Sequence, residues 1–168
     1  MRLINNYLEF VSKKNSQIAL FILLNICGLI FIFLPYDIFN NMLDLYFSYD
    51  VETVYNNYVA IGEDGRHINL YSILILDTIY PILYTSLVLG AFEKLYSRQH
   101  TFIFMIPVLA FFLDISENLQ LAYMNLTFTN LNVFQVMVAS ACTSLKWIVV
   151  STMILLLLIG VIKKNFSV

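Results

Sequence analysis

Charged residues are scarce in this chain. Only 12 % of its 168 residues are Asp, Glu, Lys or Arg, and 60 % are hydrophobic. A soluble domain of this length is normally about a quarter charged and about half apolar. The composition is therefore not that of an ordinary soluble domain, and we expect no nucleic acid among its partners.

Sequence signatures of the common catalytic and metal sites are also missing. The chain has no G-x-S-x-G, P-loop, H-E-x-x-H or haem-binding pattern, and no Ser–His or Cys–His pair falls at one depth. These absences argue against a nucleophilic hydrolase. The two cysteines, Cys27 and Cys142, stand in no C-x-x-C or Cys/His spacing and indicate neither a disulfide nor zinc. We expect no cofactor.

Long apolar blocks dominate the chain instead. Three have the roughly 20 residues that a helix needs to cross about 30 Å of hydrocarbon, and the first is at the short end. That first block lacks an A-x-A-like cleavage site, so we expect a retained anchor and not a signal peptide. Residues 1–168 are predicted to be a single all-α transmembrane domain. It is a polytopic four-helix bundle with spans at about 18–34, 70–90, 102–123 and 133–162.

The distribution of basic residues predicts the orientation of these spans. Basic clusters precede the first span, separate the second from the third and follow the fourth, whereas the other two connections share one basic residue, Arg66. By the positive-inside rule, both termini are cytoplasmic and residues 35–69 and 124–132 face outward. The clustered residues are Arg2, Lys13, Lys14, Lys94, Arg98, Lys163 and Lys164.

The outward connection, residues 35–69, carries the signature of a short helix. Asp50 is a plausible N-cap, and Glu52 falls in the first turn. Apolar residues then recur at helical spacing over 51–59, and Gly62 is a fitting stop. We expect an amphipathic extracytoplasmic cap helix between the first two spans. The alternative is a solvated loop with some helix in it.

Four ionisable residues fall inside the predicted spans: Asp77, Asp114, Glu117 and Lys146. A charge at the bilayer centre costs about 2.5–3.5 kcal/mol on insertion scales, so such residues usually face the bundle interior and pair. The three acids lie about 9–13 Å from the outer ends of their spans, and Lys146 about 20 Å, at 1.5 Å per residue. Helical spacing gives each span one polar face: Asp77, Tyr80, Pro81 and Tyr84; Asp114, Glu117 and Asn118; Gln135, Ala139, Cys142 and Lys146.

Pro81 lies in the middle of the second span. It removes a backbone hydrogen bond and so frees the carbonyl near residue 77. Either it kinks the helix and widens a pocket, or it is a tolerated proline.

A set of short motifs gives the chain a resemblance. The motifs are LDL at 43–45, Tyr49, GEDGR at 62–66, Tyr71, DTIYP at 77–81, Tyr84 and DISEN at 114–118. Over residues 43–118 the chain resembles uncharacterised small four-span bacterial integral membrane proteins. The resemblance implies the bacterial inner (cytoplasmic) membrane and brings no activity with it. The chain is also similar in outline to the sterol isomerase and sigma-2 receptor superfamily, without a motif matched residue by residue.

These patterns predict a buried acidic site, open toward the outer leaflet, for a membrane lipid or another amphiphilic small molecule. Asp114, Glu117 and Asp77 would carry polar recognition or acid/base chemistry. No metal is expected, because few oxygen ligands are available and a lysine competes for them. The predicted ligand-binding residues are Asn118, Lys146, Tyr80, Tyr84, Arg66 and Tyr49.

Several alternatives stay open. The site either only binds its ligand or also modifies it, and the acids could instead be a structural cluster. A proton- or cation-coupled small transporter would use the same acids as a relay, with a homo-oligomer supplying the path that Ser151 and Thr152 alone do not. A non-catalytic membrane assembly or immunity factor is a further class. Arg66 either contacts an anionic headgroup or is a solvated loop residue.

Overall fold

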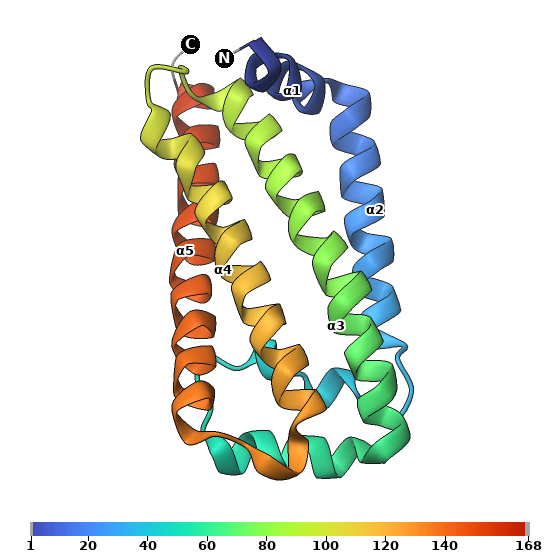
Figure 1. Cartoon of the computed structure of the whole chain (residues 1–168). Coiled ribbons are helices and arrows are strands. Elements are labelled where there is room, and N and C mark those ends of the chain that lie inside the picture. The colour runs from blue at the N-terminus through green and yellow to red at the C-terminus, as the bar shows by residue number, and fades with distance from the viewer. Residues whose placement is uncertain (1, 167–168) are drawn as a thin grey trace.

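The computed structural model describes residues 2–166, which form helices joined by short connections and contain no strand. The helices make one bundle with both chain termini at the same end (Figure 1). The predicted all-α class is confirmed. The α-helices are α1 Arg2–Ser12, α2 Lys14–Ile32, α3 Val51–Leu95, α4 Thr101–Leu126 and α5 Val133–Phe166. Single-turn 3-10 helices, η1 Phe39–Asn41, η2 Leu43–Leu45 and η3 Phe128–Asn130, lie in the connections.

Four of these helices, α2 to α5, are long and apolar enough to cross a membrane. Their outward faces carry large apolar side chains that are more than half exposed, such as Phe21, Phe112 and Leu155. In water, an exposed apolar surface of this size would lead to aggregation. In a membrane, lipid tails solvate it. The chain is therefore a multi-pass helical membrane bundle.

The helix bounds differ from the predicted spans chiefly in α3. Its bounds, Val51–Leu95, include two helical stretches that meet at a kink at Gly62. Gly62 has φ +70°, a left-handed conformation that glycine adopts without the steric penalty of a Cβ. Helical geometry thus breaks at the residue predicted as the stop of the cap helix, and a second helical stretch begins directly after it instead of near residue 70.

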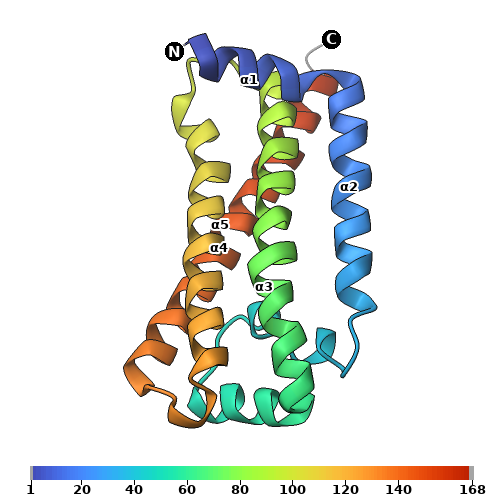
Figure 2. The same ribbon diagram turned by 45° about the vertical axis from the view of Figure 1, so that its right-hand side comes forward.

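Residues 51–61 of α3 cross the end of the bundle opposite the two termini (Figure 2). Asp50 caps this segment, since its Oδ1 accepts a hydrogen bond from the Thr53 N–H at 2.8 Å. That bond holds the pKa of the Asp50 carboxyl below its usual value. The buried Tyr58 donates its hydroxyl to the Leu121 carbonyl oxygen at 3.1 Å. The segment is thereby fixed to α4.

The connection between α2 and α3 includes residues 42–49, which we call the strap. It lies above the crossing segment in the view of Figure 1, alongside the lower part of α5. Three side chains of α5 hold its backbone, so its path is set by α5 and not by its own secondary structure. The three hydrogen bonds run from Trp147 Nε1 to Asp44 O (3.0 Å), from Ser144 Oγ to Phe47 O (2.7 Å) and from Tyr49 N to Ser140 Oγ (2.9 Å).

At the opposite end of the bundle, α1 lies across α3 (Figures 1 and 2). Gln17 Nε2 donates to the carbonyl oxygens of Val11 (2.7 Å) and Leu87 (3.1 Å), which ties the α1–α2 corner to α3. The approach is close because Gly90 lies directly beneath. A Cβ at Gly90 would come within 3 Å of the Val11 backbone and of Gln17 Nε2.

We predict that Gly90→Ala lowers the free energy of unfolding by about 1–3 kcal/mol, the usual effect of overpacking. The added methyl group has to push α1 away from α3. The thermal unfolding midpoint in detergent and the rate of protease cleavage within α1 both measure this. Gly28→Ala is the matched control, since nothing lies within 4 Å of a Cβ there. Equal midpoints for the two variants would contradict the packing described.

Candidate functional site

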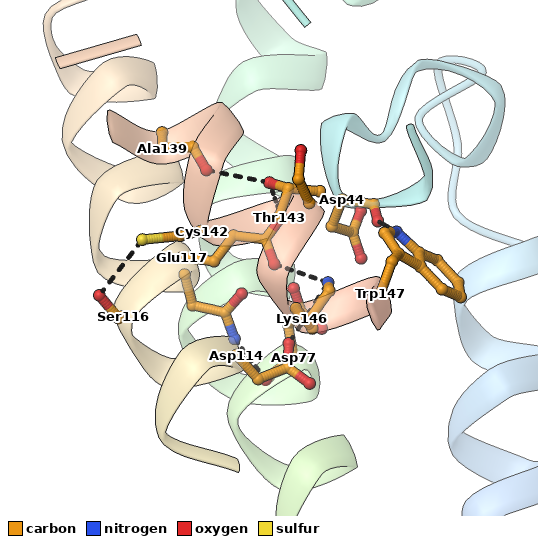
Figure 3. Close-up of polar contacts among 12 residues, drawn as sticks. Asp44, Asp77, Asp114, Ser116, Glu117, Ala139, Cys142, Thr143, Lys146 and Trp147 are labelled. Carbon is orange, nitrogen blue, oxygen red and sulfur yellow. Dashed lines mark hydrogen bonds and ion pairs between the residues drawn. The ribbon is translucent and has the colours of Figure 1, made fainter. Parts of the chain in front are cut away.

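Lys146 of α5 is the centre of a buried ionic cluster (Figure 3). Its side chain is 8 % exposed, and its Nζ lies 2.6 Å from Glu117 Oε2 and 3.5 Å from Asp114 Oδ1. Both acids come from α4, where a spacing of three residues puts them on one face. The structure thus brings these three sequence-predicted residues together.

Each of the two acids has a second partner on another helix. The Tyr84 hydroxyl of α3 donates to Asp114 Oδ2 at 2.8 Å. The Thr143 hydroxyl of α5 donates to Glu117 Oε1 at 2.5 Å and lies 3.3 Å from the Tyr49 hydroxyl. All four carboxylate oxygens of the pair therefore have a partner. The two carboxylates share one ammonium, and neutral hydroxyl donors hold their remaining oxygens, as buried carboxylates require.

Thr143 was not among the predicted site residues. It lies in the run of small residues 139–144. Such a run predicts close helix packing and does not by itself predict a polar role for the Thr143 hydroxyl. The available signal was its position three residues before Lys146, on the same face of the helix.

Asn118 has a structural partner that follows from Pro81. The missing N–H of Pro81 leaves the Asp77 carbonyl oxygen without its helical donor. Asn118 Nδ2 of α4 supplies one at 2.5 Å. The prediction of a freed carbonyl at residue 77 is consistent with this bond. The helical backbone continues through Pro81, because the dihedrals of α3 depart from helical values only at Gly62.

A cavity of about 630 Å³ lies beside this cluster, between α2 and α5. One wall is apolar and comes from α2, for example Leu24 and Leu29. Polar groups line the opposite side, where Asp114 and Lys146 face the cavity. The cavity joins apolar walls to a buried ionic site, which is the usual make-up of a small-molecule pocket.

Most of the predicted site residues either line this cavity or lie directly behind its lining. Asp77, Asp114, Lys146, Tyr80 and Tyr84 line it. Glu117, Asn118 and Tyr49 are buried behind the lining, where they hold it in place through Lys146, the Asp77 carbonyl and Thr143.

Arg66 lies outside the cavity, so the structure does not place it with the other predicted ligand-binding residues. Its guanidinium carbon is 4.3 Å from the centre of the Phe128 ring, and its Nη1 donates to the Tyr58 carbonyl oxygen at 3.1 Å. The Arg66 carbonyl oxygen accepts from Asn125 Nδ2 at 3.1 Å. The bend at Gly62 turns this part of α3 toward the end of α4. Arg66 therefore holds the bend against α4.

Asp44 of the strap is an acid that the sequence analysis did not place in the site. It lines the cavity together with Asp77, and Trp147 fixes its backbone. Burial raises the pKa of its carboxyl, and the Lys146 ammonium partly offsets that rise. The motif LDL at residues 43–45 is the sequence pattern that could have indicated this position, because an acid between two leucines has apolar neighbours.

We predict that Asn118 and Pro81 are energetically coupled. Asn118→Ala leaves the Asp77 carbonyl buried without a donor, which costs about 1–3 kcal/mol. In a Pro81→Ala background residue 81 regains its N–H, which can donate to the Asp77 carbonyl. Asn118→Ala should then lower the free energy of unfolding by less than in wild type, and the difference, about 0.5–3 kcal/mol, is the coupling energy. Unfolding free energies of the four proteins in detergent measure the cycle. Pro107→Ala replaces Pro81→Ala in the control cycle and should be additive with Asn118→Ala. Additivity in both cycles would contradict the interpretation that Asn118 Nδ2 replaces the backbone N–H that Pro81 lacks.

The site combines two carboxylates in contact with one lysine, further acids at the cavity surface and an apolar wall. Among residues 2–166, no three His, Cys, Asp or Glu side chains are arranged to hold one metal ion. Comparison with protein-family models, curated proteins and solved structures finds no match to this chain. Its chemistry therefore has to be inferred from its own geometry.

Proposed function

We propose that this membrane protein binds a lipid-like or amphiphilic small molecule in the cavity between α2 and α5. The observation that carries the proposal is the two-sided lining. Apolar residues of α2 and α5 cover one part, and Asp44, Asp77, Asp114 and Lys146 cover the other. An apolar tail gains about 0.8 kcal/mol for each CH₂ group that it buries, while the acids and Lys146 bind the polar head.

The arrangement of α2 supports access from the lipid. α2 packs against α3 and barely touches α5, so the side of the cavity between α2 and α5 has no tight helix contact to cross. Phe21, Leu29 and Ile32 line the cavity and are also about half exposed on the outside of the bundle. A molecule dissolved in lipid therefore reaches the cavity sideways through an apolar surface.

We place the cavity in the outer half of the bacterial inner membrane, with both termini cytoplasmic. Seven of the nine Lys and Arg residues lie in α1, at the α1–α2 junction and the start of α2, at the end of α3 and in the α3–α4 connection, or at the end of α5. Those segments meet at one end of the bundle (Figure 1). The positive-inside rule assigns that end to the cytoplasm. The strap and residues 51–61, which lie at the other end, then form an extracytoplasmic cap over the cavity.

The cluster has the groups that acid/base chemistry requires. Asp114 faces the cavity, and its second oxygen is held by Tyr84, so the carboxyl is oriented before a ligand arrives. Glu117 lies behind and shares Lys146 with it. In this proposal Asp114 and Asp77 contact the polar head, and Lys146 and Glu117 balance charge when a proton moves.

A coupled transporter would need a polar route from the cluster toward the termini. In the described part of the chain, that direction is filled by an apolar cluster. Its members include Val88, Phe92, Ala110 and Met153, all of them buried. This packing favours a pocket with one membrane-facing opening over a path through a single bundle.

We predict that native mass spectrometry of the gently solubilised protein shows a co-purifying amphiphile. Asp114→Asn/Glu117→Gln should reduce its occupancy by about tenfold or more, equivalent to about 1.4 kcal/mol of binding. The matched control is Asp64→Asn/Glu63→Gln, the same chemical change at two exposed acids. Equal occupancy in both double variants, or no bound molecule in any protein, would contradict the proposed function.

The orientation has its own test in Cys27→Ala/Cys142→Ala protein. Single cysteines at Asp64 and at Lys163 should react differently with a membrane-impermeant maleimide added to intact cells. Asp64→Cys should be labelled because the proposal places it outside, and Lys163→Cys should be protected until the cells are lysed. The reverse pattern would overturn the placement of the cavity in the outer half.

A further inference from the structure

Two of the four acids near the cavity, Asp114 and Glu117, are in ion-pair contact with Lys146, and the other two, Asp44 and Asp77, are not. We propose that Asp44 and Asp77 form a binding site for an ammonium group, so that the ligand is an amphiphilic amine. This inference rests on the proposed function, since it names the head group of the molecule that the cavity binds.

The charges near the cavity are unequal. Three carboxyl groups line it, those of Asp44, Asp77 and Asp114, and Glu117 lies behind them, whereas Lys146 is the one basic side chain in its lining, within residues 2–166. The other basic residues belong to the terminal end of the bundle, except Arg66, which lies against Phe128. Buried charges normally have a partner of opposite sign, so a further cation is the missing component.

Lys146 is not available to all four acids. Its ammonium lies 2.6 Å from Glu117 and 3.5 Å from Asp114. Tyr84 and Thr143 occupy the remaining oxygens of those two carboxyls. The oxygens of this pair thus have partners without a ligand. The charge of a bound cation is met chiefly by the other two acids, while Asp114 contacts the head group from its place in the cavity lining.

Asp77 has an oxygen that lacks a donor. Its side chain lines the cavity, the residue is only 5 % exposed, and no group in the described chain donates a hydrogen bond to Oδ2. The neighbouring Asn118 does not help, because its Nδ2 binds the Asp77 carbonyl and its Oδ1 is itself a buried acceptor without a donor. An unpaired buried acceptor is costly, and a donor from the ligand would remove that cost.

Asp44 presents a second carboxyl to the same space. It lines the main cavity with Asp77, and both also line a smaller void beneath the cap segment. The strap holds it there through the hydrogen bond from Trp147 to its carbonyl oxygen. Two acids from separate segments thus face one volume.

The chemistry of the head group follows from these two acids. A protonated amine supplies a positive charge and up to three N–H donors, which match two carboxyls and an orphaned oxygen. A neutral alcohol supplies a donor without the charge. A quaternary ammonium supplies the charge without a donor. A phosphate would be buried beside like charges.

The protonation of Asp44 gives the binding a direction with pH. Burial raises the pKa of this carboxyl, and the titratable groups around it are Lys146, Asp77, Asp114, Tyr80 and, behind the lining, Glu117. A carboxyl with a raised pKa keeps its proton to higher pH, and an ammonium binds only the deprotonated form. Affinity for an amine should therefore increase as the pH rises through the titration of this carboxyl, while an alkylamine itself stays protonated.

The test uses Trp147, the single tryptophan of the chain, which lines the cavity. Its fluorescence is titrated with dodecylamine, dodecyltrimethylammonium, dodecanol and dodecyl phosphate in phosphatidylcholine nanodiscs at pH 7.5, at equal membrane loading. Dodecylamine should bind at least about tenfold more tightly than the other three, and more tightly at pH 7.5 than at pH 5.5. Asp77→Asn and Asp44→Asn should each weaken it by about tenfold. Asp64→Asn, an exposed control, should bind like wild type.

The outcomes separate this inference from the proposed function. If dodecanol or dodecyl phosphate binds as tightly as dodecylamine, the amine assignment is overturned while an amphiphile pocket stands. If dodecyltrimethylammonium equals dodecylamine, the hydrogen-bonding role of Asp77 is overturned. If none of the four probes changes the fluorescence, the proposed function fails as well. The wild-type series decides these points even where Asp77→Asn does not fold, and Asp77→Glu should retain the preference for dodecylamine.

Discussion

The ion pair of Lys146 with Glu117 and Asp114 is the interaction on which the rest of the site depends. An isolated charge in lipid is so unfavourable that α4 and α5 have to meet at this level, with these faces toward each other. The same pair positions Tyr84 of α3 and Thr143 of α5 through hydrogen bonds to its outer oxygens. One buried contact thus sets the rotation of three helices about their axes.

Much of the architecture was predictable because hydrocarbon permits few solutions. Every backbone group that faces lipid must be bonded within its own segment, so long apolar blocks have to be helices. Helical spacing also identified the facing surfaces, since three and four residues separate Asp114, Glu117 and Asn118. The role of Pro81 followed from its missing N–H, although the sequence did not show that Asn118 supplies the replacement donor.

The parts that were missed depend on tertiary contacts of irregular backbone. The path of the strap is set by side chains of α5 more than 90 residues away, so nothing near Asp44 in the sequence indicates that it lines the cavity. Arg66 was hard to place for a related reason. Its direction depends on the bend at Gly62 and on Phe128, a residue of a different connection.

The position of α2 has a consequence for the proposed pocket. Among the membrane-length helices α2 packs chiefly on α3, and the ionic cluster belongs to α4 and α5, with Tyr84 of α3. A tilt of α2 therefore changes the width of the apolar side without disturbing a single contact of Lys146. The apolar wall of the cavity can thus move while its polar side stays fixed. If the proposed function holds, such a pocket would accept tails of different length and branching and would discriminate among molecules by their head groups.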